Sequence, residues 1–351
     1  MARNAEGVWN DSCVLGVLET FHDGMMETLA FIGSDKNAGK TTVFNFVYRK
    51  MHAVYTTVCM TSIGINGEPV DTYEGHPKPK ITVYKHSFFI TAGEHLRPHT
   101  GKYETVHLFL PPHSSKPYVL ARSLLDLDLV LEGPNTQKEL MEMKGLIGMV
   151  LPSCPLLVDG SIDRQFLAHP TVCDGFYFAV LASSRKQQIR KANDFLTALA
   201  FPVCPKDLRG DIEEFQTDET KSLLLGGSPG PIYHGRQIPF LDEALRETVK
   251  RQKGEECVLY LDGALSKSLF SFLSPFSKLT VVLDNFTLYQ NVSADAGLGR
   301  SFRPRLFLLH PANVKSIFLN VEGEAHRSRL KIPPHIPVHN LYREDLHEIG
   351  V

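Results

Sequence analysis

The stretch from Phe31 to Thr42, FIGSDKNAGKTT, constrains this chain more than any other. An apolar run from Leu29 to Ile32 leads into it, and a helix-prone run from Val43 to Met51 follows it. This pattern predicts a β-strand, a tight loop and the N-terminus of an α-helix. Backbone N–H groups of such a loop and the positive end of the helix dipole favour an anion, so the segment is typical of a phosphate-binding loop.

Each residue of this loop has an expected part in binding a nucleotide. Lys40 is expected to act in catalysis by reaching the outer phosphates, and the Thr41 hydroxyl is expected to coordinate Mg²⁺. The strict phosphate-loop pattern has glycine at the position of Ser34, and here that glycine is one residue earlier. The competing interpretation is a chance turn before an ordinary helix. The other expected cofactor contacts are Gly33, Ser34, Asp35, Lys36, Asn37, Ala38, Gly39 and Thr42.

Acidic residues after apolar strands are candidates for holding the Mg²⁺ shell. Asp159 follows the apolar run Leu156 to Val158, the form of a Walker B segment, and is expected to act in catalysis and as a metal ligand. Glu132 ends a predicted strand that begins at Leu127 and is a further expected metal ligand. The pattern is common at strand ends, and it also fits Asp128, Asp262 and Asp284.

Several other polar residues have two open interpretations. Arg164 is either a phosphate contact or a surface arginine paired with Asp163. The segment 61–71, with Thr61, Ser62, Glu68 and Asp71, either helps to hold Mg²⁺ or forms a solvated turn, and 73–80 is either a lid or a connector. For the histidine-rich region 80–113, solvated side chains are favoured over a metal site.

The apolar patterns predict an α/β fold in two parts. Residues 1–201 are expected to form a nucleotide-binding domain around a parallel sheet, with strands at 28–32, 53–60, 80–84, 87–91, 105–110, 127–131, 156–158 and 175–181 and helices at 40–52, 137–144 and 184–200. Residues 202–238, rich in Pro, Gly and acidic residues, are expected to be a linker or irregular insertion. Residues 239–351 are expected to form a smaller C-terminal α/β domain, with helices at 241–251 and 265–273 and strands at 257–261, 279–283, 305–309 and 316–321.

Composition narrows the function classes. The 351 residues carry a net charge of −2 and no basic block with interleaved aromatics, which argues against nucleic-acid binding. No run approaches the roughly 18 apolar residues of a membrane span. Six scattered cysteines and an N-terminus without signal-peptide form favour a cytoplasmic protein. No Asn-Lys-x-Asp string of the kind that reads guanine occurs, so ATP is preferred to GTP.

The loop run Gly33 to Thr41 resembles the loop of dethiobiotin synthetases and related ATP-using, Rossmann-like P-loop proteins. Further segments are similar to the P-loop subunit of lysine 5,6-aminomutase reactivases: the loop itself, Leu131 to Pro134, Leu157 to Arg164, Asp174-Gly175 and Tyr260 to Leu265. The similarity is scattered over roughly residues 29–321, and its most specific part is the loop.

This second resemblance implies an ATPase that acts as a reactivating chaperone. Such a protein exchanges inactivated cobalamin on a B12-dependent aminomutase, and a second reactivase subunit is the other implied partner. Lys40 and Thr41 are then nucleotide contacts, while Asp159 and Arg164 match motif positions of unknown role. The first resemblance implies the alternative, an ATP-dependent small-molecule ligase or kinase. A nucleotide-bound interaction module without turnover is a third interpretation.

Overall fold

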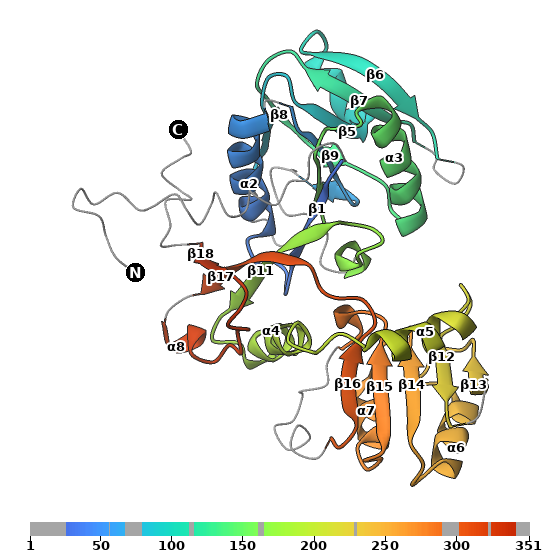
Figure 1. Cartoon of the computed structure of the whole chain (residues 1–351). Helices are drawn as coiled ribbons and strands as arrows, with labels where there is room; N and C mark the ends of the chain where they lie inside the picture. Colours follow the sequence, from blue (N-terminus) through green and yellow to red (C-terminus); the bar gives the residue numbers. More distant parts are fainter. Residues whose placement is uncertain are drawn as a thin grey trace. The chain divides into compact units, whose positions relative to one another are not determined.

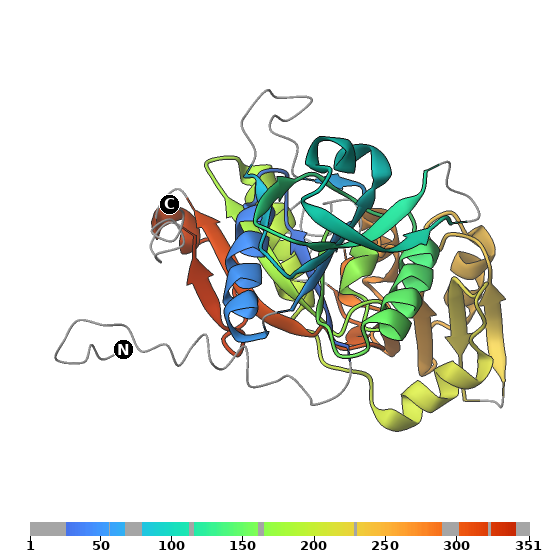
Figure 2. The same ribbon diagram turned by 90° about the horizontal axis from the view of Figure 1, so that it is seen from above.

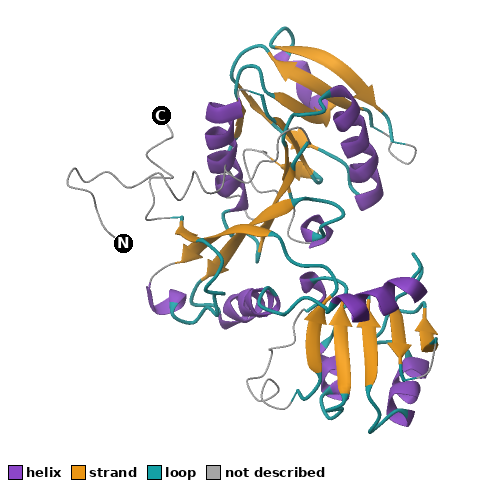
Figure 3. Cartoon of the chain, in the orientation of Figure 1, coloured by secondary structure: helices purple, strands orange, loops and turns teal. Residues whose placement is uncertain are grey.

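The computed structural model describes residues 26–55, 57–66, 79–111, 116–160, 165–227, 230–289, 302–321 and 324–341. The described chain is a mixed α/β structure (Figure 1, Figure 3). It divides into two compact units, each described below by itself. Unit 1 comprises the described residues up to 32 together with 40–167 and 172–177, and unit 2 comprises 33–39, 168–171 and the described residues from 178 onward.

The N-terminal half of the chain alternates strands with two long helices. The helices are α2 (Lys40–Tyr55) and α3 (Gln137–Val150), and a 3₁₀ helix, η1, covers Gly93–His99. The strands are β1 (Thr28–Gly33), β2 (Cys59–Ser62), β3 (Ile65–Asn66), β4 (Ile81–Val83), β5 (Phe88–Ala92), β6 (Tyr103–Phe109), β7 (Tyr118–Ser123), β8 (Leu127–Leu129), β9 (Leu131–Glu132) and β10 (Leu156–Asp159).

The C-terminal half contains shorter helices and a second set of strands. Its helices are α4 (Lys186–Ala198), α5 (Lys206–Phe215), α6 (Glu243–Arg251), α7 (Lys267–Leu273) and α8 (Glu324–Arg327), with 3₁₀ helices η2 (Gln165–Ala168) and η3 (Phe286–Leu288). Its strands are β11 (Gly175–Ala182), β12 (Ser222–Leu225), β13 (Pro231–Gly235), β14 (Cys257–Leu261), β15 (Leu279–Leu283), β16 (Arg305–Leu308), β17 (Val314–Val321) and β18 (Val338–Asn340).

The strands form one large sheet, one medium sheet and two small ones. The large sheet has the strand order β18-β17-β11-β1-β10-β2-β5-β7-β6, and the medium sheet has the order β13-β12-β14-β15-β16. Two antiparallel pairs, β3 with β9 and β4 with β8, stand apart from them. The large sheet is mostly parallel: β1 with β10, β10 with β2, β2 with β5 and β17 with β18 pair parallel, whereas β5 with β7 and β7 with β6 pair antiparallel.

Parallel pairing brings two strand ends of unit 1 to one edge. β10 lies between β1 and β2, with Asp159 opposite Phe31 on one side and opposite Ser62 on the other. Phe31 is fully buried and its ring stacks on Tyr177, with ring centroids 5.1 Å apart. Since ligands of parallel α/β sheets bind at the carboxyl ends of the strands, a ligand site is expected at this edge.

Helices α2 and α3 cover opposite faces of the sheet in unit 1 (Figure 1, Figure 2). Helix α2 buries residues at helical spacing: Val43, Phe44, Val47, Tyr48 and Met51. Helix α3 is capped by Thr136, whose Oγ1 accepts from Glu139 N, and Glu139 Oε2 in turn accepts from the N–H of Asn135, the residue before the cap. The apolar stripe of each helix fixes which face packs on the strands.

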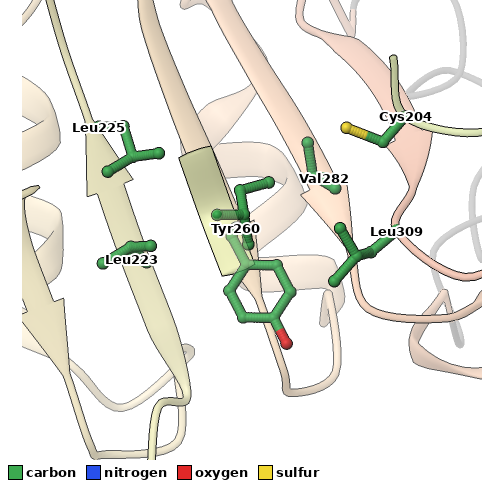
Figure 4. Packing of buried hydrophobic residues seen from close by; sticks show 7 residues of the cluster. Cys204, Leu223, Leu225, Tyr260, Val282 and Leu309 are labelled. Atoms are coloured by element: carbon green, nitrogen blue, oxygen red, sulfur yellow. The ribbon is translucent and has the colours of Figure 1, made fainter. Parts of the chain in front are cut away.

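The medium sheet of unit 2 has a core of its own (Figure 4). One face carries Leu223, Leu225, Tyr260 and Val282, and Ile212 of α5 packs against it with 0 % exposure. Figure 2 shows α5 on one side of this sheet and α6 on the other. The strands β14, β15 and β16 are parallel. β14 and β15 are nearly all buried, as expected for strands covered on both faces, whereas the edge strand β16 is mostly exposed or half-buried.

The structure confirms most of the expected elements and corrects several. The predicted strand over 53–60 is wrong in its first half, because α2 continues to Tyr55. Tyr55 continues the four-residue spacing of Val47 and Met51 along one face of the helix. The strand β7 was not anticipated. Residues 127–132 form strands in the two small sheets instead of one strand of the large sheet.

The expected linker or irregular insertion over 202–238 is not irregular. It contains α5, β12 and β13, and both strands belong to the medium sheet. The sequence pattern does not predict helix α5, because its apolar face consists of only Leu208, Ile212 and Phe215 among polar residues. The predicted domain boundaries, after residue 201 and before residue 239, stay predictions.

Among the described residues, no helix is both long enough and apolar enough to cross a membrane. The described cysteines Cys59, Cys154, Cys173, Cys204 and Cys257 are free thiols in buried positions, as the sequence predicts. Burial raises the pKa of Cys154 and of Cys173 to about 12, so these thiols are protonated at neutral pH.

We expect Gly133→Ala to destabilise the protein, because a Cβ at this position would lie 1.8 Å from the Ser62 carbonyl oxygen. A backbone oxygen cannot rotate away, so the free energy of unfolding should fall by about 1–3 kcal/mol or more. Gly145→Ala is the matched control, because nothing lies within 4 Å of its added Cβ inside α3. It should raise stability by about 0.5–1 kcal/mol. Urea denaturation measures the free energy of unfolding of both variants. The same change for Gly133→Ala and Gly145→Ala would contradict the close packing at Gly133.

Candidate functional site

The site centres on Lys40, Thr41 and Asp159 in unit 1. Lys40 and Thr41 are the first residues of α2, and Asp159 is the last residue of β10. The Lys40 ammonium forms an ion pair with Asp159 Oδ1, and the Thr41 hydroxyl donates to Asp159 Oδ2 at 3.4 Å. The structure therefore brings together three of the residues that the sequence predicts to act on phosphate and Mg²⁺.

The environment of Asp159 makes its charge costly. The carboxylate is fully buried, and burial raises its pKa, although the Lys40 ammonium and the hydrogen bonds from Lys40 and Thr41 offset part of this increase. Lys40 remains 16 % exposed, so the ion pair opens to solvent on the lysine side.

The loop Gly33–Gly39 belongs to unit 2 and is a tight turn. Ala38 N donates to Asp35 O at 3.2 Å, and the φ angles of Asn37 and Gly39 are 61° and 90°. A side chain at Gly39 would be strained by this φ, and its Cβ would lie 2.5 Å from a methyl group of Leu341. The second glycine of the loop is thus required by backbone geometry.

Ser34 explains why the first glycine is displaced by one position. Its side chain is fully buried, its N–H donates to Ala179 O at 2.9 Å, and its Oγ accepts from Leu181 N at 2.9 Å. The hydroxyl fastens the start of the loop to β11, a function that glycine lacks. The N–H of Ser34 is therefore committed within the protein, which leaves its expected nucleotide contact a prediction.

The rest of the loop is braced from elements of unit 2. Asn320 Nδ2 donates to Asn37 O at 3.0 Å, and Lys191 Nζ lies 3.8 Å from Asp35 Oδ1. Lys36 is exposed, and its N–H donates to Asp35 Oδ1 at 2.9 Å. Thr42 lies partly exposed in the first turn of α2. These contacts fix the loop, and the nucleotide contacts expected of its residues stay predictions.

Glu132 lies in a separate polar cluster of unit 1. Its carboxylate bonds to His95 Nε2 at 2.7 Å and accepts from Lys116 Nζ at 3.1 Å, and Lys116 Nζ also lies 2.5 Å from Glu94 Oε1. Sequence reasoning missed these two partners of Glu132, because they come from η1 and from the segment before β7. Its expected role as a Mg²⁺ ligand stays a prediction.

The other candidates are dispersed. Thr61 and Ser62 are buried, and their hydroxyls donate to backbone carbonyls of Ile90 and Leu131. Asp128 lies within β8, where the Thr82 hydroxyl lowers its pKa. Asp262 directly follows β14 and Asp284 directly follows β15, two strands of the medium sheet. Glu68, Asp71, His113, Asp163 and Arg164 lie outside the described residues.

Comparisons with protein-family models, with curated proteins and with solved structures find no match to this chain.

We expect Lys40→Met to destabilise the protein in a pH-dependent way. The variant leaves the Asp159 carboxylate buried beside a neutral chain, and breaking a buried ion pair costs about 3–5 kcal/mol. Because the folded-state pKa of this carboxyl lies above its unfolded value, the cost is fully present above the folded pKa and is relieved as pH falls through it. The loss in free energy of unfolding should be larger at about pH 8 than at about pH 5.

Denaturation curves of wild type and variant at the two pH values measure this difference. Lys50→Met, near the other end of the same helix, is the matched control and should cost little at either pH. A loss for Lys40→Met that is the same at both pH values would contradict the role of the buried carboxyl.

Proposed function

We propose that this chain binds Mg²⁺-ATP through the segment 33–42 and hydrolyses it. The observation that supports this most strongly is the contact of both Lys40 and Thr41 with the two oxygens of Asp159. These residues come from the start of a helix and the end of a neighbouring parallel strand, the edge where nucleotides bind in related folds. We further propose that the fold is of the Rossmann-like P-loop type, with a second α/β domain.

The residues present suit the chemistry of a magnesium ion. The Thr41 hydroxyl and the Asp159 carboxylate are hard oxygen donors 3.4 Å apart, and Mg²⁺ prefers such donors while retaining several waters. Lys40 is the cation that would leave Asp159 to contact the outer phosphates. Glu132 contacts His95 and Lys116 in its own cluster, and its part in the metal site stays a prediction.

The proposed chemistry is transfer of the terminal phosphoryl group to water. Bound Mg²⁺ supplies a Lewis acid that neutralises charge on the outer phosphate oxygens. The chain contributes the Lys40 ammonium as a second cation, and Asp159 keeps the Thr41 hydroxyl oriented. The preference for ATP follows from the lack of a guanine-reading string in the sequence.

We also propose a partner: a B12-dependent aminomutase that this chain reactivates, together with a second reactivase subunit. This proposal is supported by a sequence resemblance to the reactivase family. The resemblance covers the loop and the segments 157–164 and 260–265. In such a cycle ATP binding favours one conformation of the complex and hydrolysis resets it. A differential affinity of about 5.5 kcal/mol suffices to move a two-state equilibrium from 1:99 to 99:1.

The second candidate is an ATP-dependent ligase or kinase for a small molecule. The loop favours it, because the Gly-Ser-Asp start and the Gly-Lys-Thr end together resemble dethiobiotin synthetases. The two candidates share the nucleotide site and differ in the acceptor, which is a protein complex in one and a metabolite in the other.

We expect Lys40→Ala to abolish measurable Mg²⁺-ATP binding and phosphate release. Isothermal titration calorimetry measures the binding, and a phosphate-release assay measures turnover. Lys50→Ala, a lysine further along α2, is the matched control and should leave both unchanged. Equal ATP affinity for wild type and Lys40→Ala would refute the proposed site.

We expect a pull-down from the native organism to recover a B12-dependent enzyme whose binding changes with ATP. The same experiment with Lys40→Ala should lose the response to ATP. Recovery of no B12 enzyme, alongside phosphate release stimulated by a metabolite, would select the ligase or kinase instead.

A further inference from the structure

Three neighbouring parallel strands of unit 2 end at one place. Asp262 follows β14 directly, Asp284 follows β15 directly, and His310 follows β16 after one intervening residue. Backbone bonds hold these ends together, since Asp284 N donates to Leu261 O and His310 N donates to Asp284 O, each at 2.9 Å. This is the carboxyl edge of the medium sheet, the usual ligand edge of parallel strands.

A second histidine reaches the same carboxylate. His169, from the segment 168–171 of unit 2, places Nε2 2.9 Å from Asp284 Oδ2, and His310 Nε2 lies 3.7 Å from Asp284 Oδ1. The two imidazole rings meet edge to face with centroids 4.8 Å apart. One ligand atom from each of the three residues lies within 4.8 Å of the other two.

We propose that His169, Asp284 and His310 bind one divalent cation of the first transition series, such as Zn²⁺, Co²⁺ or Fe²⁺. Two imidazole nitrogens and one carboxylate are a ligand set used for catalytic zinc and for non-haem iron. Such a set leaves coordination positions open. The side chains of His169 and His310 are 16 % and 25 % exposed, so water or a small ligand can reach the site.

Surrounding groups hold the ligands in place. Tyr260 OH donates to Asp284 Oδ1 at 2.9 Å, and Asn285 Nδ2 donates to Asp284 Oδ2 at 3.1 Å. His169 Nδ1 accepts from Thr171 N at 3.2 Å and lies 2.7 Å from Thr171 Oγ1, so Thr171 holds the imidazole ring with Nε2 directed at Asp284. Partners of this kind fix ligand orientation in metal sites.

The cluster in unit 1 with a similar composition is a poorer metal site. There Lys116 Nζ lies 2.5 Å from Glu94 Oε1 and 3.1 Å from Glu132 Oε1, so an ammonium already supplies the positive charge. Among the described residues, no lysine or arginine forms an ion pair with Asp284. The negative charge at the end of β15 is instead faced by two imidazoles, which are neutral metal ligands when deprotonated.

This site lies outside the residues proposed to bind ATP, and its test is independent of the nucleotide. After dialysis against a chelator, the full chain is titrated with Co²⁺ and followed by visible absorption, and with Zn²⁺ and followed by calorimetry. We expect about one equivalent to bind, and we expect His169→Ala, His310→Ala and Asp284→Asn each to weaken binding by more than about 100-fold. Tyr260→Phe should weaken it by about 10-fold.

Two variants serve as controls. His335→Ala removes an exposed histidine, and Lys40→Ala removes the proposed phosphate contact, and both should bind metal as wild type does. Circular dichroism verifies that each variant folds, and Zn²⁺ should raise the melting temperature of wild type but not of the three ligand variants. Wild type without saturable binding, or folded ligand variants with wild-type affinity, would overturn the proposal.

Discussion

The buried carboxylate of Asp159 is the constraint around which unit 1 is arranged. A charged group cut off from water at the end of a central strand is costly unless a cation and hydrogen bonds meet it. Lys40 and Thr41 meet it, because α2 begins beside the edge where β10 ends. The same arrangement that stabilises the folded chain leaves one cation, one hydroxyl and one carboxylate together at the ligand edge of a parallel sheet.

Local signals in the sequence were sufficient for much of the fold. The strand before the loop and the strands over 257–261 and 279–283 are predicted nearly to the residue, since each is a continuous apolar run. The helix after the loop is predicted correctly at its start, because its helical stripe is clear. Tyr55 and Ile212 show where this fails: one continues a helix into an apolar run that resembles a strand, and the other is the buried anchor of a mostly polar helix.

The candidate site was predictable in part for the same reason. Lys40 and Thr41 follow from spacing alone, but an acid after an apolar run marks Asp159, Asp262 and Asp284 equally. Only the strand order, which is set by contacts between distant segments, places Asp159 beside β1. Pairings such as His169 with Asp284, 115 residues apart, leave no local pattern to read. The role of Ser34 likewise depends on the neighbouring strand.

The central claim is that Lys40 exchanges Asp159 for the phosphates of a bound nucleotide. A crystal structure of the full chain with Mg²⁺ and a non-hydrolysable ATP analogue tests it most directly. The account predicts the triphosphate against the loop 33–41, with Lys40 Nζ on its outer phosphates and Mg²⁺ beside Thr41 and Asp159. An analogue bound elsewhere, or a bound analogue with Lys40 still paired to Asp159, would contradict it.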